Sequence, residues 1–201
     1  MSINIDYFLS HASPWTYLGS VRFHDIAKRA GASITYRPVS YGKIFPISGG
    51  LPVGKRAPQR QRYRFAELAR WRDYLNVPLN LEPKFFPVSD QAASHMVVAA
   101  DRQGLDAGQL SNAILRAVWA EDRNIADDNT LIAIANEQGM DGDALLAASK
   151  TEETAGLFDT YTQEAIDRNV FGAPTYILGD DMFWGQDRLE FLERALSGNT
   201  C

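Results

Sequence analysis

Segments with the pattern of β-strands lie only towards the two ends of this 201-residue chain. Near the N-terminus, residues 3–8 and 33–38 are rich in bulky and β-branched side chains, and a helical pattern lies between them. Near the C-terminus, residues 174–178 and 182–184 flank Gly-Asp-Asp, which predicts a β-hairpin, and residues 185–196 predict a closing helix. A single sheet must therefore join the beginning of the chain to its end.

The order of these elements restricts the fold further. A strand, a helix and a strand within residues 3–38 form a βαβ unit, in which the strands are parallel and the crossover is right-handed. A helical block follows, and then two strands and a helix, which is the order of the thioredoxin fold. We predict an α/β chain of the thioredoxin type with a large all-helical insertion after the second strand. Residues 1–40 and 170–201 would form the thioredoxin-like domain, and residues 41–169 the inserted helical domain.

The middle of the chain predicts a series of helices with apolar faces. We expect them at residues 60–75, at 89–104 with Ser89 or Asp90 as the N-cap, around 110–118, after a cap at Asp127 or Asp128, and after a capping box of Ser149 and Glu152. Tyr63 is expected on the apolar face of the first of these helices. His95 is expected to be a packing residue.

Residues 39–58 are predicted to be a long irregular connection, because they contain four glycines and three prolines. Connections of this length within a compact chain are usually functional or disordered. Apolar side chains such as Ile44 and Phe45 favour an ordered loop that forms part of a site.

Six basic residues and no acidic residue lie between residues 41 and 66. They are Lys43, Lys55, Arg56, Arg60, Arg62 and Arg64. A local positive patch on a chain with a formal net charge of −5 can attract and hold a small anion. The alternative is a solvated helix face, and the sequence alone favours neither.

Ser13 and Pro14 carry the signature of a helix start directly after the first strand, with Ser as the N-cap and Pro at the first helical position. The N-terminus of a helix offers free N–H groups and the positive end of the helix dipole, which suits an anion. Within this segment alone, a plain N-cap is the favoured interpretation of Ser13, because Ser is among the preferred caps.

Composition restricts the class of protein. The negative net charge argues against general nucleic-acid binding, and no apolar run approaches the roughly 18 residues of a membrane span. No signal peptide is visible at the N-terminus. The only cysteine is Cys201, which excludes an intramolecular disulfide and a catalytic dithiol, agrees with a cytoplasmic location, and predicts a frayed tail thiol.

Gly172, Ala173 and Pro174 precede the third strand. In the predicted sheet this loop lies beside the N-terminus of the first helix. We predict a cis Ala173–Pro174 peptide bond that exposes the backbone of Ala173 to a ligand. The alternative is an ordinary trans proline at the start of a strand.

Five short motifs, spread in order along essentially the whole chain, carry a family resemblance. They are SPWTYL at residues 13–18, RPV at 37–39, RW at 70–71, FGAPT at 171–175 and WGQDRL at 184–189. Together they resemble the 2-hydroxychromene-2-carboxylate isomerases and the kappa-class glutathione transferases, which have a fold like that of the disulfide oxidoreductase DsbA. Ser13 stands where DsbA has its first redox cysteine.

The resemblance implies glutathione as the cofactor. Ser13 would stabilise its thiolate, and the backbone at Ala173 and Pro174 would align its peptide chain. Asp187 and Arg188 would bind the γ-glutamyl end, although helix capping and a surface ion pair are the alternative for these two. Arg60 stands where the family often has a Lys that holds a carboxylate. Gly50 replaces a frequent Asn, which puts the substrate in doubt.

The implied reaction is the interconversion of 2-hydroxychromene-2-carboxylate and trans-o-hydroxybenzylidenepyruvate in aromatic hydrocarbon degradation, for example of naphthalene. Lys43, Phe45 and Lys55 would bind the small aromatic substrate. Two alternatives stay open: a kappa-type glutathione transferase or peroxidase, and a thioredoxin-fold binding module without turnover. No metal, nucleic-acid or membrane partner is expected. An exposed apolar face on the inserted helices would indicate a homodimer, but the sequence does not locate one.

Overall fold

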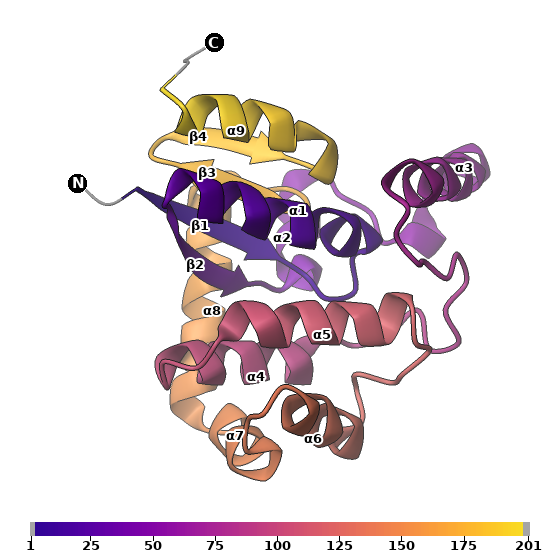
Figure 1. The fold of residues 1–201 in the computed structure, drawn as a ribbon. Helices are drawn as coiled ribbons and strands as arrows, with labels where there is room; N and C mark the ends of the chain where they lie inside the picture. Colours follow the sequence, from indigo (N-terminus) through magenta and orange to yellow (C-terminus); the bar gives the residue numbers. More distant parts are fainter. Residues whose placement is uncertain (1–2, 199–201) are drawn as a thin grey trace.

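A computed structural model of the protein describes residues 3–198, so the prediction about Cys201 lies outside the described residues. One four-stranded sheet contains β1 (Asn4–Leu9), β2 (Ser33–Pro38), β3 (Thr175–Leu178) and β4 (Asp181–Trp184), in the order β2-β1-β3-β4. β1 is parallel to β2 and antiparallel to β3, and β4 is antiparallel to β3. The two ends of the chain therefore build one sheet, as predicted (Figure 1).

Helices cover both faces of this sheet, and the alternation of β1 decides which residues face each layer. Ile5, Tyr7 and Leu9 pack against α1 (Pro14–Ala30) and α9 (Leu189–Leu196) on one face. Phe8 points the other way and packs against α2 (Tyr41–Ser48) and α8 (Glu152–Asp167). The central strand β1 is thus covered on both sides.

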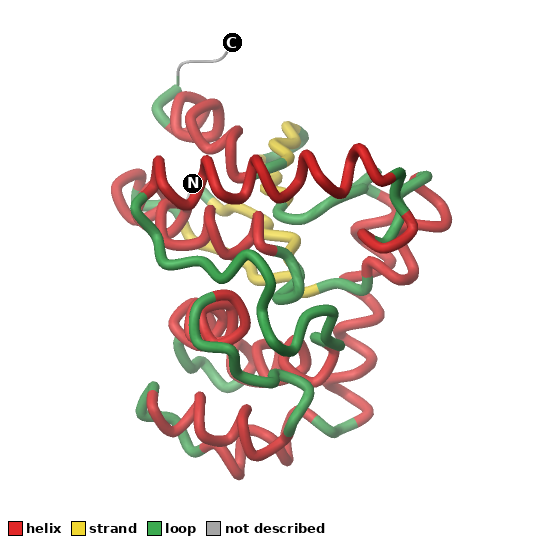
Figure 2. The backbone as a smooth tube through the Cα atoms, turned by 90° about the vertical axis from the view of Figure 1, so that its right-hand side faces the viewer, coloured by secondary structure: helices red, strands yellow, loops and turns green. Residues whose placement is uncertain are grey.

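The insertion between β2 and β3 contains helices and no strand within the described residues. Besides α2 and α8 these are α3 (Pro58–Leu75), α4 (Gln91–Arg102), α5 (Ala107–Trp119), α6 (Asp128–Glu137) and α7 (Gly142–Ser149). Figure 2 shows the strands gathered in one small region, with helices around it. The largest apolar cluster joins α4 to α7 and also includes Tyr17 and Leu18 of α1, so the insertion packs directly on the first helix. The thioredoxin-type fold with a helical insertion is confirmed.

The prediction of an irregular connection at residues 39–58 is wrong in part. Residues 41–48 form α2, and Val53–Lys55 form a 3-10 turn, η1. Gly42 and Pro46 disguise the helix in the sequence, but Pro46 is accommodated near its end and Ile44 is fully buried beneath it. The apolar side chains therefore order this segment, as the sequence indicated.

The expected capping box at Ser149 and Glu152 is also wrong. Ser149 is the last residue of α7, a helix that the sequence pattern did not reveal, and its hydroxyl donates to the carbonyl of Leu146 at 2.7 Å. Thr151 is the N-cap of α8 and accepts from the N–H of Thr154. A short helix directly before another helix makes two candidate caps look alike in the sequence.

After β4, the chain forms a 3-10 turn, η2 (Gln186–Arg188), and α9 then begins at Leu189. None of the helices within residues 3–198 has the length and apolar character needed to cross a bilayer.

Close packing of α6 on α7 can be tested at Gly142. A Cβ atom there would lie 2.4 Å from the carbonyl oxygen of Ile132, so Gly142→Ala should lower the free energy of unfolding by about 1–3 kcal/mol. Gly156→Ala in α8 is the matched control, because its Cβ would meet no described atom within 4 Å, and it should stabilise by about 0.5–1 kcal/mol. Urea unfolding of both variants measures the difference, and equal effects would contradict the close approach of the two helices.

Candidate functional site

The register of the sheet brings three connecting segments to one end. Leu9, the last residue of β1, lies opposite Pro38 at the end of β2. Thr175, the first residue of β3, lies opposite Phe8 and also opposite Trp184, the last residue of β4. The turn after β1, the loop before β3 and the turn after β4 therefore meet at this end of the sheet.

Ser13 lies at the centre of this end. It is the N-cap of α1, and its Oγ accepts from the N–H of Thr16 at 3.3 Å. The same hydroxyl donates to the carbonyl of Ala173 at 3.4 Å, which is long for an O–H···O bond. This hydrogen bond is therefore weak, and the hydroxyl can donate to another acceptor instead. Among the described residues, the N–H of Trp15 has no hydrogen-bond partner. A polarised hydroxyl and a free N–H thus share the positive end of the α1 dipole.

The predicted cis peptide bond at Ala173–Pro174 is present, and its loop faces Ser13. The carbonyl of Gly172 accepts from the hydroxyl of Tyr41 at 2.7 Å, so α2 helps to hold the loop. A Cβ atom at Gly172 would lie 2.3 Å from the indole nitrogen of Trp184, which explains the glycine. The N–H of Ala173 makes no hydrogen bond within the described residues, so this backbone edge is open to a ligand.

The inserted helices hold the turn between β1 and Ser13. The carboxylate of Asp90 accepts from the hydroxyl of Ser10 at 2.6 Å and from the N–H of Ala12 at 3.1 Å. Asp90 is the N-cap residue of α4, as the sequence suggested, but its side chain makes no capping hydrogen bond to that helix. The indole of Trp119 donates to the carbonyl of His11 at 3.1 Å. Sequence reasoning missed these contacts because about 80 to 110 residues separate the partners.

His11 is the buried link between the two parts of the chain. Its ring nitrogens lie 3.3 Å from the hydroxyl of Ser94 and 3.1 Å from that of Ser111, on α4 and α5. Burial lowers the pKa of His11 to about 4, and the negative charge of Asp90 opposes this shift only in part. The ring is therefore neutral at physiological pH, and the two hydroxyls serve as its polar partners.

Asp187 and Arg188 lie in η2, at the end of the sheet that holds Ser13. Their side chains form an exposed ion pair of 2.6 Å. Between them and β4, Gln186 is 2% exposed and its side-chain oxygen accepts from Arg22 of α1 at 3.0 Å. A Cβ atom at Gly19 would lie 2.8 Å from that of Gln186, so the turn sits directly on α1. Sequence reasoning missed Gly19, although the small residue on an otherwise bulky helix face was a usable signal.

The predicted substrate residues lie on different elements. The ammonium of Lys43 is paired with Asp159 of α8 at 2.7 Å, so it already has an anionic partner. The ring of Phe45 packs beside Tyr41, and a Cβ atom at Gly50 would lie 2.3 Å from it, which explains the glycine at that position. Lys55 in η1 is exposed.

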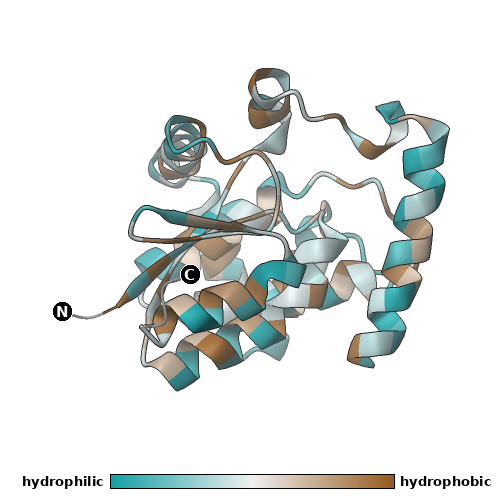
Figure 3. Ribbon diagram, turned by 90° about the horizontal axis from the view of Figure 1, so that it is seen from above, coloured by the Kyte–Doolittle hydropathy of each residue, from teal (hydrophilic) through white to brown (hydrophobic). Residues whose placement is uncertain are grey.

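Arg60 is exposed in the first turn of α3. Figure 3 shows this helix at the margin of the molecule, with hydrophilic residues along much of its length.

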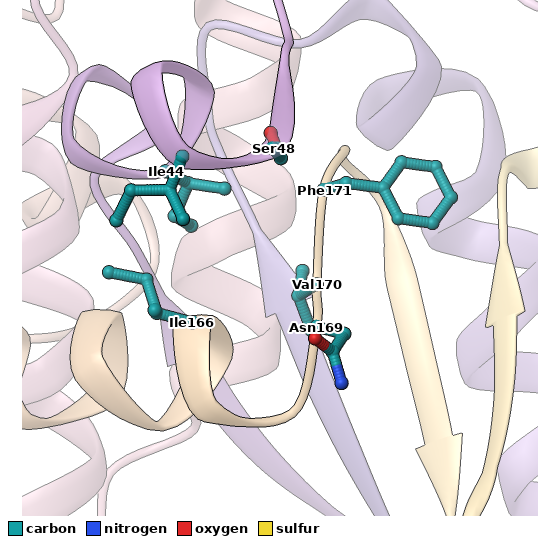
Figure 4. A pocket seen from close by; sticks show the side chains of 7 residues that line it. Ile44, Ser48, Ile166, Asn169, Val170 and Phe171 are labelled. Carbon is teal, nitrogen blue, oxygen red and sulfur yellow. The ribbon is translucent and has the colours of Figure 1, made fainter.

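A cavity of about 270 Å³ lies beside the site rather than in it. It is lined by Ile44, Ile47, Ser48, Ile166, Asn169, Val170 and Phe171. Figure 4 shows the ring of Phe171 directed away from Ile44 and Ile166, and this ring packs on Trp184 at 4.8 Å between centroids. The cavity is smaller than the roughly 300–1,000 Å³ typical of ligand pockets, and Ser13 does not line it.

Residues 4–197 match the family model of the DsbA-like thioredoxin domain, which defines the class of this protein. The chain is 31% identical over 198 residues to the 2-hydroxychromene-2-carboxylate isomerase of Sphingobium xenophagum, and the similarity covers 98% of this chain and 99% of that protein. It is 22% identical to glutathione S-transferase kappa 1 of Homo sapiens, over 96% of this chain and 90% of that one.

A solved structure of a 2-hydroxychromene-2-carboxylate isomerase aligns with a TM-score of 0.81 at 26% identity, over 97% of this chain and 95% of that one. The chain belongs to the family of the 2-hydroxychromene-2-carboxylate isomerases, and it is an enzyme of the isomerase class.

The neutral state of His11 makes stability depend on pH. Unfolded His11 binds a proton near pH 6.5, and folded His11 only near pH 4. As the pH falls through this window, the unfolded state takes up the proton first, so the free energy of unfolding should drop by about 3 kcal/mol. Urea unfolding of wild type and His11→Gln between pH 4 and 7.5 isolates this effect, because carboxylates titrate in both proteins. Parallel curves would show that His11 is not the cause.

Proposed function

We propose that this protein is a glutathione-dependent isomerase that interconverts 2-hydroxychromene-2-carboxylate and trans-o-hydroxybenzylidenepyruvate. The observation that carries the proposal is the placement of the Ser13 hydroxyl at the N-terminus of α1, opposite the cis Ala173–Pro174 bond. The names of the relatives support the same reaction. Glutathione as the cofactor is supported by the relationship to glutathione S-transferase kappa 1.

The residues present fit glutathione. The open N–H and the carbonyl of Ala173 suit the backbone of an extended peptide, in the way that one strand pairs with another. Asp187 in η2 would accept from the γ-glutamyl ammonium, and Arg188 would assist in holding its carboxylate. The exposed Arg60 of α3 would hold the carboxylate at the glycine end, and a guanidinium can do so bidentately.

When bound, glutathione supplies a thiol nucleophile whose reversible addition turns the double bond of the substrate into a single bond that can rotate. The chain supplies the stabilisation of negative charge. The hydroxyl of Ser13 would donate a hydrogen bond to the thiolate, and the free N–H of Trp15 and the α1 dipole would favour the same ionised form. No step requires a second sulfur from the protein.

Two exposed aromatic side chains next to the Ala173 loop suit the aromatic ring of the substrate. Phe171 and Trp184 are 41% and 50% exposed, and they pack against each other next to the loop of Ala173. Phe45 lies beside Tyr41, whose hydroxyl holds that loop. We infer that Phe171 and Trp184 contact the aromatic ring directly, a role that the sequence assigned to Phe45.

Turnover of 2-hydroxychromene-2-carboxylate with and without glutathione tests the function. We expect ultraviolet absorbance to show approach to one equilibrium mixture from either compound, with the rate dependent on glutathione. A conjugate that accumulates with an aromatic electrophile, in place of isomerisation, would favour the kappa-type transferase alternative. Glutathione binding without either activity would favour a binding module.

Ser13→Ala should slow turnover by roughly tenfold to a hundredfold near neutral pH, because a hydrogen bond to a charged group contributes about 1.5–3 kcal/mol. Raising the pH should recover part of the rate by ionising the thiol directly. The variant also loses an N-cap, so Asp127→Ala is the matched control: Asp127 caps α6 by accepting from Thr130 at 2.8 Å. The control should lose stability and keep its turnover. If the thiolate absorbance of the glutathione complex titrates identically in wild type and Ser13→Ala, Ser13 is only an N-cap.

A further inference from the structure

One buried cation of α3 has no anionic partner among the described residues. The apolar pattern predicts Tyr63 on the inner face, but Tyr63 is 61% exposed and Arg64 only 7%. The Nη2 atom of Arg64 is buried without a hydrogen-bond partner, and no carboxylate of residues 3–198 lies within 4.0 Å of the guanidinium. Burying an unpaired charge is costly, so an arrangement of this kind needs a reason.

The position of Arg64 connects it to the site. Its guanidinium lies over the ring of Phe86, 5.5 Å from the centroid. Phe86 packs on Trp119 at 5.0 Å, and the indole of Trp119 donates to the carbonyl of His11, two residues before Ser13. Two aromatic rings therefore separate Arg64 from the turn that carries Ser13. Figure 1 shows α3 on the side of the molecule where β1 ends and α1 begins.

Two further cations lie near Arg64, while Glu67, the nearest acid along α3, is paired with Arg70. Burial and, as a smaller cause, the positive charge of nearby Arg56 together lower the pKa of Arg64 to about 10. Arg60 in turn acts on Arg56, and it lies one helical turn before Arg64 on the same face of α3. None of the three forms an ion pair within the part of the chain that the structure describes. An anion between them would relieve both the repulsion and the unpaired burial.

We propose that Arg64 is the anchor for the carboxylate of the 2-oxo acid substrate, an inference that rests on the proposed function. A planar guanidinium binds a carboxylate bidentately, which also orients the conjugated 2-oxo acid attached to it. Of the two basic residues that the sequence suggested for the substrate, Lys43 is paired with Asp159 and Lys55 is exposed in η1. Arg60 is exposed and suits the glycine end of glutathione. Arg64 is buried, and it contacts Phe86, which packs on Trp119 beside the Ser13 turn.

Direct binding of a substrate-like acid tests the anchor without turnover. The probes are trans-benzylidenepyruvate and its uncharged methyl ester, titrated by calorimetry in the absence of glutathione. We expect wild type to bind the acid at least tenfold more tightly than the ester. Arg64→Met should reduce this ratio to less than threefold, Arg64→Lys should retain part of it, and Arg62→Met, an exposed change on the same helix, should leave it unchanged.

Two further measurements separate the anchor from a structural role. Because Arg64 has no anionic partner within the described residues, and methionine keeps an apolar contact with the ring of Phe86, Arg64→Met should melt at the same temperature as wild type or higher. Its affinity for glutathione should also stay within about twofold of wild type.

The proposal is overturned if Arg64→Met keeps the preference for the acid, or if it loses glutathione affinity instead, which would assign the carboxylate to glutathione. Should Arg64→Met fail to fold, wild type and Arg64→Lys decide the question. A partial loss of the preference for the acid in Arg64→Lys would support the anchor. The anchor is contradicted if wild type shows no preference for the acid, or if Arg64→Lys keeps the full preference. A wild type that binds the acid selectively but shows no isomerisation rejects the proposed function alone.

Discussion

The site depends on the hydrogen bonds that tie the turn before Ser13 to the inserted helices. Three consecutive residues, 10 to 12, are held in this way. Asp90 accepts from Ser10 and Ala12, Trp119 donates to the carbonyl of His11, and the hydroxyls of Ser94 and Ser111 contact the buried His11 ring. A turn that follows a strand and precedes a helix would otherwise be free to move. The insertion is therefore not an addition beside the thioredoxin-like part, because it fixes the geometry at which α1 presents its N-terminus.

Much of the fold could be predicted because its signals are local. The strand at residues 33–38, the cap at Ser13, the hairpin after Pro174 and the cis bond follow from short patterns and from the element order. The helix α2 was not predicted, because Gly42 and Pro46 are residues typical of loops. The burial of Ile44, which stabilises this helix, is visible only in the folded structure. Propensity is a weak guide wherever packing decides.

The site was predictable where one segment carries it and not where distant segments meet. Ser13 and Ala173 were identified from their own surroundings, and the sheet register brings them together. The ion pair of Lys43 could not be predicted, because its partner Asp159 lies on α8, far along the sequence. Arg64 was grouped with the other basic residues of 41–66, as part of an anion-holding patch or of a solvated helix face, and nothing in the local sequence indicates that it is buried.

The order of the strands has a consequence for synthesis of the chain on the ribosome. β1 is made first, and β2 can pair with it soon afterwards, but the other edge of β1 pairs with β3, in which Tyr7 lies opposite Tyr176. That edge has no partner until nearly the whole insertion has emerged, and such non-local pairing makes folding slow. An open strand edge is also a template for wrong association. The helices of the insertion, which form from local contacts, can fold in the interval, so the last elements to be made close both the sheet and the site.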